Sequence, residues 1–250
     1  MDLTETIFNC TEITKKYDGT PVVENISLSL RKNGFISLLG PSGIGKTTLF
    51  NVLAGVDTPD AGNVYLHGED ITGISGKVSY MLQKDLLLEY RTVCDNVILP
   101  LVIRGERKKI AREKAAVHFP RFGLSGYENK YPAQLSGGMR QRAALLRTVM
   151  SHNDVILLDE PFSALDAITR RGMQQWYCEI AQAMELSTLF ITHDAEEALI
   201  LSDTVYVMNG HPGSIIANFD VLPARPRTHD FSSSAQFAAQ KRNILEAIGL

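Results

Sequence analysis

The chain has 250 residues, 44% of them hydrophobic and 21% charged, so it can bury a full core in one or two domains. Its formal net charge of −3 removes the bulk electrostatic case for nucleic-acid binding. The mean hydropathy of −0.04, without any apolar run near the roughly 18 residues of a spanning helix, excludes a membrane-embedded protein. An acidic N-terminus unlike a secretory signal and three scattered cysteines favour a reducing cytoplasm.

Three short apolar segments, at residues 35–39, 155–158 and 188–191, are predicted to be buried strands. The first ends in a glycine-rich turn that opens a helix at Lys46. The second ends at Asp159 and the third at His193. Longer helical patterns separate these segments, which predicts a largely parallel sheet covered by helices. Polar residues at the carboxyl ends of parallel strands are where ligands bind in such sheets.

The stretch from about residue 85 to 150 contains no convincing strand and predicts an inserted helical subdomain. We expect a capping box of Thr92 with Asp95, a charged helix over residues 107–118 and a further helix opened by Ser136. Acidic residues interrupt the basic run of the charged helix, which favours a solvated face over a phosphate or lipid surface. The last thirty residues, with a helical pattern from about 234 to 248, are expected to form an appended tail.

Residues 40–47 match the pattern GxxxxGK[ST] between a predicted strand and a predicted helix. Such glycines let backbone N–H groups turn onto phosphate oxygens, and the helix N-terminus adds its positive dipole end. Lys46 would bring a charge to the β- and γ-phosphates, and Thr47 would offer a hydroxyl to Mg²⁺. The alternative is a glycine-rich turn that happens to precede a lysine. The predicted nucleotide-binding residues of this loop are Gly40, Pro41, Ser42, Gly43, Ile44, Gly45, Lys46, Thr47 and Thr48.

Two adjacent carboxylates, Asp159 and Glu160, follow the second predicted strand. Asp159 would hold Mg²⁺, directly or through water, and Glu160 would polarise the attacking water. Taken alone, the pair could be solvated loop charges. Downstream of a phosphate loop, it predicts a hydrolytic site.

The segment Leu-Ser-Gly-Gly-Met-Arg-Gln-Arg, residues 135–142, predicts a second place where backbone amides face an anion. Ser136 is a good N-cap, and Gly137 and Gly138 would expose the first N–H groups of the following helix. The alternative is an ordinary capped helix start.

Taken in order along the chain, these segments resemble the motifs of the ATP-binding subunits of ABC transporters, over essentially the whole length. The resemblance implies an α/β fold of the P-loop NTPase class and ABC type. Its expected parts are a mostly parallel sheet core, an antiparallel β subdomain and the inserted helical subdomain. It also implies a nucleotide-binding domain at residues 1–220 and a short tail with a helix at residues 221–250.

The resemblance assigns roles to further residues. Tyr17 corresponds to the aromatic that stacks on adenine, and Gln83 to the residue that senses Mg²⁺ and contacts the membrane partner. His193 corresponds to the switch histidine that contacts the γ-phosphate, and residues 163–166 to a loop that crosses a dimer interface. Alternatives remain: Tyr17 could be a plain core or surface aromatic, and His193 a cap for the helix that begins near Asp194.

The implied mechanism uses ATP and Mg²⁺ and needs two chains in a head-to-tail pair. Ser136, Gly137 and Gly138 of the second subunit would cover the ATP that the first subunit holds. Lys46, Glu160 and His193 would act on the phosphates and the water. Binding then closes the pair, and hydrolysis resets it.

Residues 83–97 and 222–227 resemble the matching segments of the nitrate, sulfonate and taurine importer branch, which also includes vitamin-precursor importers. The implied partners are separate permease subunits and, indirectly, an extracytoplasmic substrate-binding protein, with no nucleic acid. The chain would sit at the cytoplasmic face of the membrane, held by the permease. An exporter ATPase and a nucleic-acid- or ribosome-acting ATPase remain the alternatives.

Overall fold

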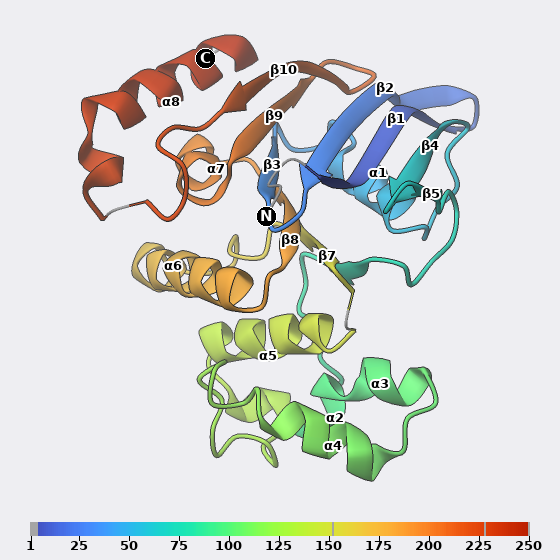
Figure 1. The fold of residues 1–250 in the computed structure, drawn as a ribbon, viewed down its shortest axis with the longest axis vertical. Coiled ribbons are helices and arrows are strands. Elements are labelled where there is room, and N and C mark those ends of the chain that lie inside the picture. Colours follow the sequence, from blue (N-terminus) through green and yellow to red (C-terminus); the bar gives the residue numbers. More distant parts are fainter. Residues whose placement is uncertain (1–4, 152, 228, 250) are drawn as a thin grey trace.

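The computed structural model describes residues 5–151, 153–227 and 229–249. At its centre is a six-stranded sheet, drawn in Figure 1, in which five neighbouring strands are parallel and β10 is an antiparallel edge strand. The order across the sheet is β10 (Ser214–Asp220), β9 (Thr204–Asn209), β3 (Phe35–Leu39), β8 (Ser187–Thr192), β7 (Val155–Asp159) and β6 (Ser79–Met81). The three predicted strands are therefore confirmed as β3, β7 and β8.

The central strands are buried on both faces because their side chains alternate between two cores. In β7, Val155 and Leu157 join one hydrophobic cluster, whereas Ile156 and Leu158 join the other. Strands of parallel sheets are apolar throughout for this reason. Uninterrupted apolar runs could therefore be recognised in the sequence.

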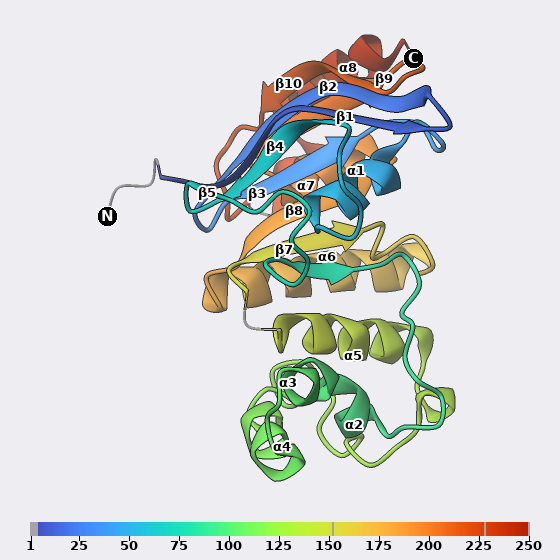
Figure 2. The same ribbon diagram turned by 90° about the vertical axis from the view of Figure 1, so that its right-hand side faces the viewer.

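A second, antiparallel sheet covers one face of the first, as Figure 2 shows from the side. Its order is β2 (Thr20–Arg31), β1 (Thr6–Tyr17), β4 (Ala61–Leu66) and β5 (Glu69–Asp70). Helix α1 (Lys46–Leu53) shares one hydrophobic cluster with both sheets through residues such as Leu49 and Phe50. The expected antiparallel β subdomain is thus present.

Helices α6 (Ala167–Ala183), α7 (Ala195–Leu201) and α8 (Ala235–Ile248) complete the sheet body. The short helix η2 (His229–Ser233) precedes α8, which begins after the N-cap Ser234 as the sequence predicts. Phe231, Phe237 and Ile244 are buried in a cluster with Leu199 of α7. The last thirty residues therefore pack on the body of the sheet. In the described residues, no helix is long and apolar enough to cross a membrane.

Between β6 and β7, all regular structure in the described residues is helical. This part contains α2 (Val93–Val97), α3 (Leu99–Ile103), α4 (Lys108–Ala116), the short η1 (Pro132–Gln134) and α5 (Gly137–Val149). Figure 2 shows these helices at the opposite end of the molecule from the antiparallel sheet, with α5 nearest to α6.

Two local predictions in the helical part need correction. Thr92 caps α2 by accepting a hydrogen bond from the Asp95 amide at 3.2 Å, but the Asp95 carboxylate pairs with Arg112 at 2.8 Å. The predicted capping box is therefore only half formed, because a guanidinium on α4 takes the carboxylate. The charged helix also ends at Ala116 rather than at residue 118, shortly before Pro120, whose ring disfavours a helical residue ahead of it.

Candidate functional site

The site lies at the carboxyl ends of three strands that are neighbours in the sheet: β3, β8 and β7. The glycine-rich loop follows β3, His193 follows β8, and β7 ends at Asp159. The glycine-rich loop lies more than a hundred residues before Asp159 and His193 in sequence, yet parallel pairing aligns the strand ends. Side chains that can hold a phosphate, a cation and a water molecule therefore meet at one edge.

The loop after β3 turns directly into α1 through Gly45, which has a positive φ of 98°. A Cβ at Gly45 would lie 2.6 Å from a methyl group of Val23, and a Cβ at Gly40 would lie 2.3 Å from the Met208 carbonyl oxygen. Only glycine fits at both positions. Gly45 also has no side chain to cap α1, so the first N–H groups of the helix can bind an anion.

Lys46 is the first residue of α1 and is only 5% exposed. Its Nζ donates to the carbonyl oxygens of Gly40 and Pro41, each at 2.7 Å. Burial lowers the pKa of Lys46, opposed by the charges of Glu160 and Asp159. A buried ammonium that carbonyls alone hold can exchange those partners for phosphate oxygens, which bind it more strongly.

Asp159 ends β7 and is 4% exposed. Its Oδ2 accepts a hydrogen bond from the Thr47 hydroxyl at 2.9 Å. Burial raises the pKa of Asp159, and the Thr47 bond works in the opposite direction. A hydroxyl and a carboxylate are thus already in contact beside the phosphate loop.

Glu160 has a positive φ of 44°, a conformation that a residue with a side chain rarely adopts. Its Oε2 lies 3.3 Å from His193 Nδ1 and accepts from Gln83 Nε2 at 3.4 Å. Ser163 donates its hydroxyl to the Glu160 carbonyl at 2.9 Å. Such strain concentrates at functional sites, where the surrounding contacts maintain it.

His193 does not cap the helix that follows it. Asp194 does so, accepting hydrogen bonds from the backbone amides of Glu196 and Glu197. The capping alternative for His193 is therefore wrong. Its side chain remains 55% exposed beside Glu160 and can contact a ligand.

A buried polar group behind His193 was not found from the sequence. Glu197 of α7 accepts from Gln174 of α6 at 2.8 Å and from the Thr192 hydroxyl, and burial raises its pKa. Thr192 immediately precedes His193. The sequence contained no signal for this network, because Gln174 and Glu197 meet only when α6 and α7 pack.

Tyr17 lies at the end of β1 with its side chain half exposed. Its hydroxyl donates to Asp57 at 2.7 Å, and this bond is the chief reason why its pKa is raised; Thr48 opposes the rise. A tyrosine that is tethered at its hydroxyl and exposed beside the start of α1 can present its ring to a base.

The segment of Ser136, Gly137 and Gly138 lies apart from these groups. Ser136 caps α5 by accepting from the Met139 amide at 3.3 Å, as predicted, and Ser136 and Gly137 are exposed. In the described residues, no hydrogen bond or ion pair joins the segment to the phosphate loop. One chain thus assembles Lys46 with the polar ends of β7 and β8, but leaves this second helix start open.

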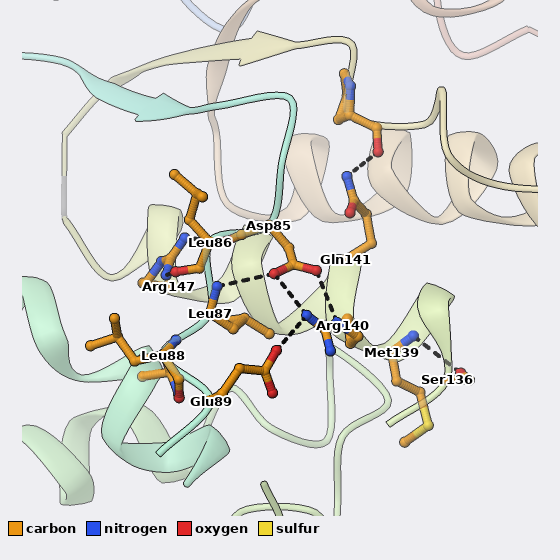
Figure 3. A network of polar contacts seen from close by, with 12 residues as sticks. Asp85, Leu86, Leu87, Leu88, Glu89, Ser136, Met139, Arg140, Gln141 and Arg147 are labelled. Carbon is orange, nitrogen blue, oxygen red and sulfur yellow. Dashed lines mark hydrogen bonds and ion pairs between the residues drawn. The ribbon is translucent and has the colours of Figure 1, made fainter. Parts of the chain in front are cut away.

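A charged network connects α5 to the segment before α2, as Figure 3 shows. Arg140 donates to Asp85 at 2.9 Å and to Glu89 at 2.8 Å. Arg147 donates to the backbone carbonyls of Asp85 and Leu86. The sequence did not predict the network, since it does not say which opposite charges meet across fifty residues.

Three features together define a P-loop nucleotide hydrolase. They are a phosphate loop after β3, the carboxylates at the end of β7 and the exposed His193 after β8. The family model for the ABC transporter matches residues 23–163. The chain is 42% identical over 202 residues to the formylaminopyrimidine import ATP-binding protein ThiZ of Halalkalibacterium halodurans, covering 80% of this chain and 79% of that protein.

Another relative is the aliphatic sulfonates import ATP-binding protein SsuB 1 of Rhodococcus jostii, 41% identical over 236 residues, with 94% of this chain and 91% of that protein covered. Among solved structures, the dimeric ATP-binding cassette MJ0796 in a post-hydrolysis state bound to ADP and Pi matches with a TM-score of 0.75 and 25% identity. The match covers 87% of this chain and all of that one. The chain belongs to the ABC transporter family and is one of its ATP-hydrolysing cassettes.

Proposed function

We propose that this chain is the ATP-hydrolysing subunit of an importer that takes up a small anion or a heteroaromatic nutrient through a separate permease. The observation that carries the proposal is the convergence of Lys46, Asp159 and Glu160 on one edge of the sheet. The direction of transport rests on relatives that are named as import proteins for sulfonates and for formylaminopyrimidine.

The phosphate loop, residues 40–48, would hold the phosphates through its backbone N–H groups and the α1 N-terminus. Lys46 would leave the carbonyls of Gly40 and Pro41 and contact the β- and γ-phosphates. Tyr17, fixed by Asp57, would stack on adenine. These residues bind and orient ATP before any bond is broken.

The oxygen donors beside the loop suit Mg²⁺. Thr47 and Asp159 are in contact at 2.9 Å, and the Gln83 side chain reaches Glu160 beside them. Hydroxyl, carboxylate and amide oxygens are the ligands that this hard cation takes. When bound, the ion would neutralise charge on the phosphate oxygens.

Glu160 would accept the proton of the attacking water at Oε2. Gln83 and His193, which belong to two other segments of the chain, contact that carboxylate and set its direction. A positioned general base contributes typically 10²–10⁴-fold to a rate. His193, exposed beside it, would contact the γ-phosphate.

A second copy would complete the site. The exposed Ser136 and Gly137 and the half-buried Gly138 of one subunit would cover the ATP held by the other, in a head-to-tail pair. ATP then bridges the two chains, and hydrolysis removes the charge that joins them. Binding would close the pair and hydrolysis would open it.

The segment from Gln83 to Leu101 would receive the permease. It presents exposed apolar side chains, Leu86 at 51% and Tyr90 at 76%, next to the Arg140 network. We propose that the chain sits at the cytoplasmic face of the membrane, with residues 1–220 as the nucleotide-binding domain and 221–250 as its tail. A substrate-binding protein outside the membrane would deliver the nutrient.

The test is a transport assay in membrane vesicles of controlled orientation that contain this chain and its co-encoded permease. We expect ATP-dependent uptake of an alkanesulfonate or of formylaminopyrimidine, and none with Glu160→Gln. Efflux in place of uptake would support the exporter alternative. ATPase activity that DNA or ribosomes stimulate, without transport, would support the nucleic-acid alternative.

A further inference from the structure

A cavity of about 660 Å³ lies between α6 and the tail, around residues 225–227 and 231–232. Among its lining residues none belongs to the phosphate loop or to the three polar strand ends described above. Its volume falls in the range of about 300–1,000 Å³ typical of small-molecule sites. The nucleotide mechanism uses none of its walls.

Part of the lining is apolar. Leu186 and Ile200 contribute aliphatic side chains, while Phe231 and Pro226 contribute rings from the tail. Phe231 also packs against Phe237 in the cluster under α8, so its ring is held in place. A ligand in this cavity would rest an apolar body on a rigid surface.

The charged part of the lining centres on Arg227. Its guanidinium is half-buried and donates to the carbonyls of Pro223, Ile200 and Val221 at 2.8, 3.2 and 3.1 Å. It lies 5.3 Å from the centre of the Phe231 ring. Burial lowers the pKa of Arg227 to about 10, and no carboxylate of the described residues forms an ion pair with it. The charge of Asp203 opposes this shift without forming an ion pair with Arg227, and an anionic ligand would supply that ion pair.

The other charges around the cavity are balanced or solvated. Arg225 is neutralised by Asp203, with bonds of 2.8 and 2.7 Å. Glu179 and Glu185 line the cavity from exposed positions, where solvent screens them. Arg171 of α6 is exposed and has no ion pair within the described ranges. The half-buried charge that lacks an ion pair in the described residues is therefore positive.

We propose that this cavity binds a small organic anion, with a carboxylate or sulfonate head against Arg227 and Arg171 and an apolar body against Phe231 and Ile200. Guanidinium groups recognise such planar or threefold oxygen heads through paired hydrogen bonds. The site is separate from ATP and separate from the transport path, which lies in other polypeptides.

The cavity has a structural connection to the catalytic edge. Gln174 lines it and also donates to Glu197, which in turn accepts from Thr192 next to His193. A ligand that moves α6 relative to the tail would therefore act on the switch. We expect binding to change the ATPase rate as well as to stabilise the fold.

The test uses Cys178, a half-buried thiol in the cavity wall, as a local reporter. Wild-type protein is alkylated with N-ethylmaleimide in the presence of benzenesulfonate, benzoate or neutral benzamide, and each cysteine is followed by peptide mass spectrometry. We expect the two anions to slow alkylation of Cys178 at least several-fold, whereas benzamide does not. Cys94, a half-buried thiol in the helical part, should react unchanged.

Three cavity variants and one control separate charge from structure. Arg171→Gln removes an exposed cation that has no ion pair in the described residues and should raise the anion concentration needed for protection about tenfold, and Arg227→Gln should abolish protection. Arg227→Lys keeps the charge and should retain protection even where the fork of hydrogen bonds is lost. Arg242→Gln, the same change on exposed α8 outside the cavity, is the matched control and should behave as wild type.

Equal protection by benzamide, or no protection by either anion, would overturn the proposal. The proposal would also fail if the anions protected folded Arg171→Gln protein as they protect wild type and did not protect Arg227→Lys protein. The charge of the side chains would then not decide binding.

Discussion

Two glycine-rich helix starts in this chain use the same physics in opposite settings. At the start of α1, Lys46 is 5% exposed and the polar ends of β7 and β8 lie beside it. At the start of α5, Ser136 and Gly137 are exposed, and in the described residues no hydrogen bond or ion pair joins the segment to the phosphate loop. The first helix start is a half-site that already has its polar side chains beside it, and the second is a half-site that faces outward.

The difference follows from what each helix packs against. Helix α1 shares a hydrophobic core with both sheets, so its N-terminus is fixed at the sheet edge. Helix α5 shares a different core, formed with the rest of the helical part, with α6 and with one face of β7, and Arg140 ties it to Asp85 and Glu89. The neighbours of a helix start therefore decide whether its backbone amides lie beside catalytic side chains or face outward.

The largest effect should come from the half-site at the start of α1. Glu160→Gln should lower ATP turnover by roughly 10²–10⁴-fold, because the group that accepts the proton is lost while the loop is untouched. ATP binding should persist and should hold the protein as a dimer, measured by size exclusion with light scattering. Glu113→Gln, an exposed change on α4, is the control. A monomer in excess ATP would contradict the two-chain site.

Lys46→Ala should weaken ATP binding by about 10–100-fold, since charge-assisted hydrogen bonds are worth roughly 1.5–3 kcal/mol each. Isothermal titration calorimetry measures the affinity directly. Lys108→Ala removes the same charge from an exposed helix position and should bind ATP like wild type. Unchanged affinity in Lys46→Ala would remove the phosphate-loop assignment.

Ser136→Ala tests the outward half-site. In a Glu160→Gln background it should weaken the ATP-dependent dimer but leave ATP binding by the monomer intact, and it should cost about 1 kcal/mol of stability through the lost cap. Ser234→Ala removes the equivalent cap of α8 and provides the matched control. If both variants dimerise equally well, the segment has no role across the interface.

The smallest effect concerns the ion pair of Arg140 with Asp85, which connects α5 to the segment before α2. A double-mutant cycle of Arg140→Met with Asp85→Asn should give a coupling energy of about 0.5–1 kcal/mol, since this pair is only partly buried. Urea unfolding of the four proteins measures it. The exposed pair of Lys114 and Glu106 should couple more weakly, and a reversed order would show that burial does not set the strength.

Much of the catalytic edge was predictable because it is encoded in local runs. The apolar strands β3, β7 and β8 lead into the polar residues that the sequence predicts for the site, and Ser136 caps α5 as expected. The contacts of those residues were not predictable. That the Glu160 carboxylate lies between Gln83 and His193 depends on how separate strands and loops are brought together.

The amino-acid sequence by itself determined the strands β3, β7 and β8 with their polar ends, the phosphate loop and the motifs that identify the family, because each depends on residues within a few positions of one another. Only the tertiary structure decided that the tail packs on α7 and forms a cavity with α6, and that Asp194 rather than His193 caps a helix. It alone decided that Arg140 pairs with Asp85. These are contacts between distant segments, and a side chain meets such a partner only after the core has closed and fixed both positions.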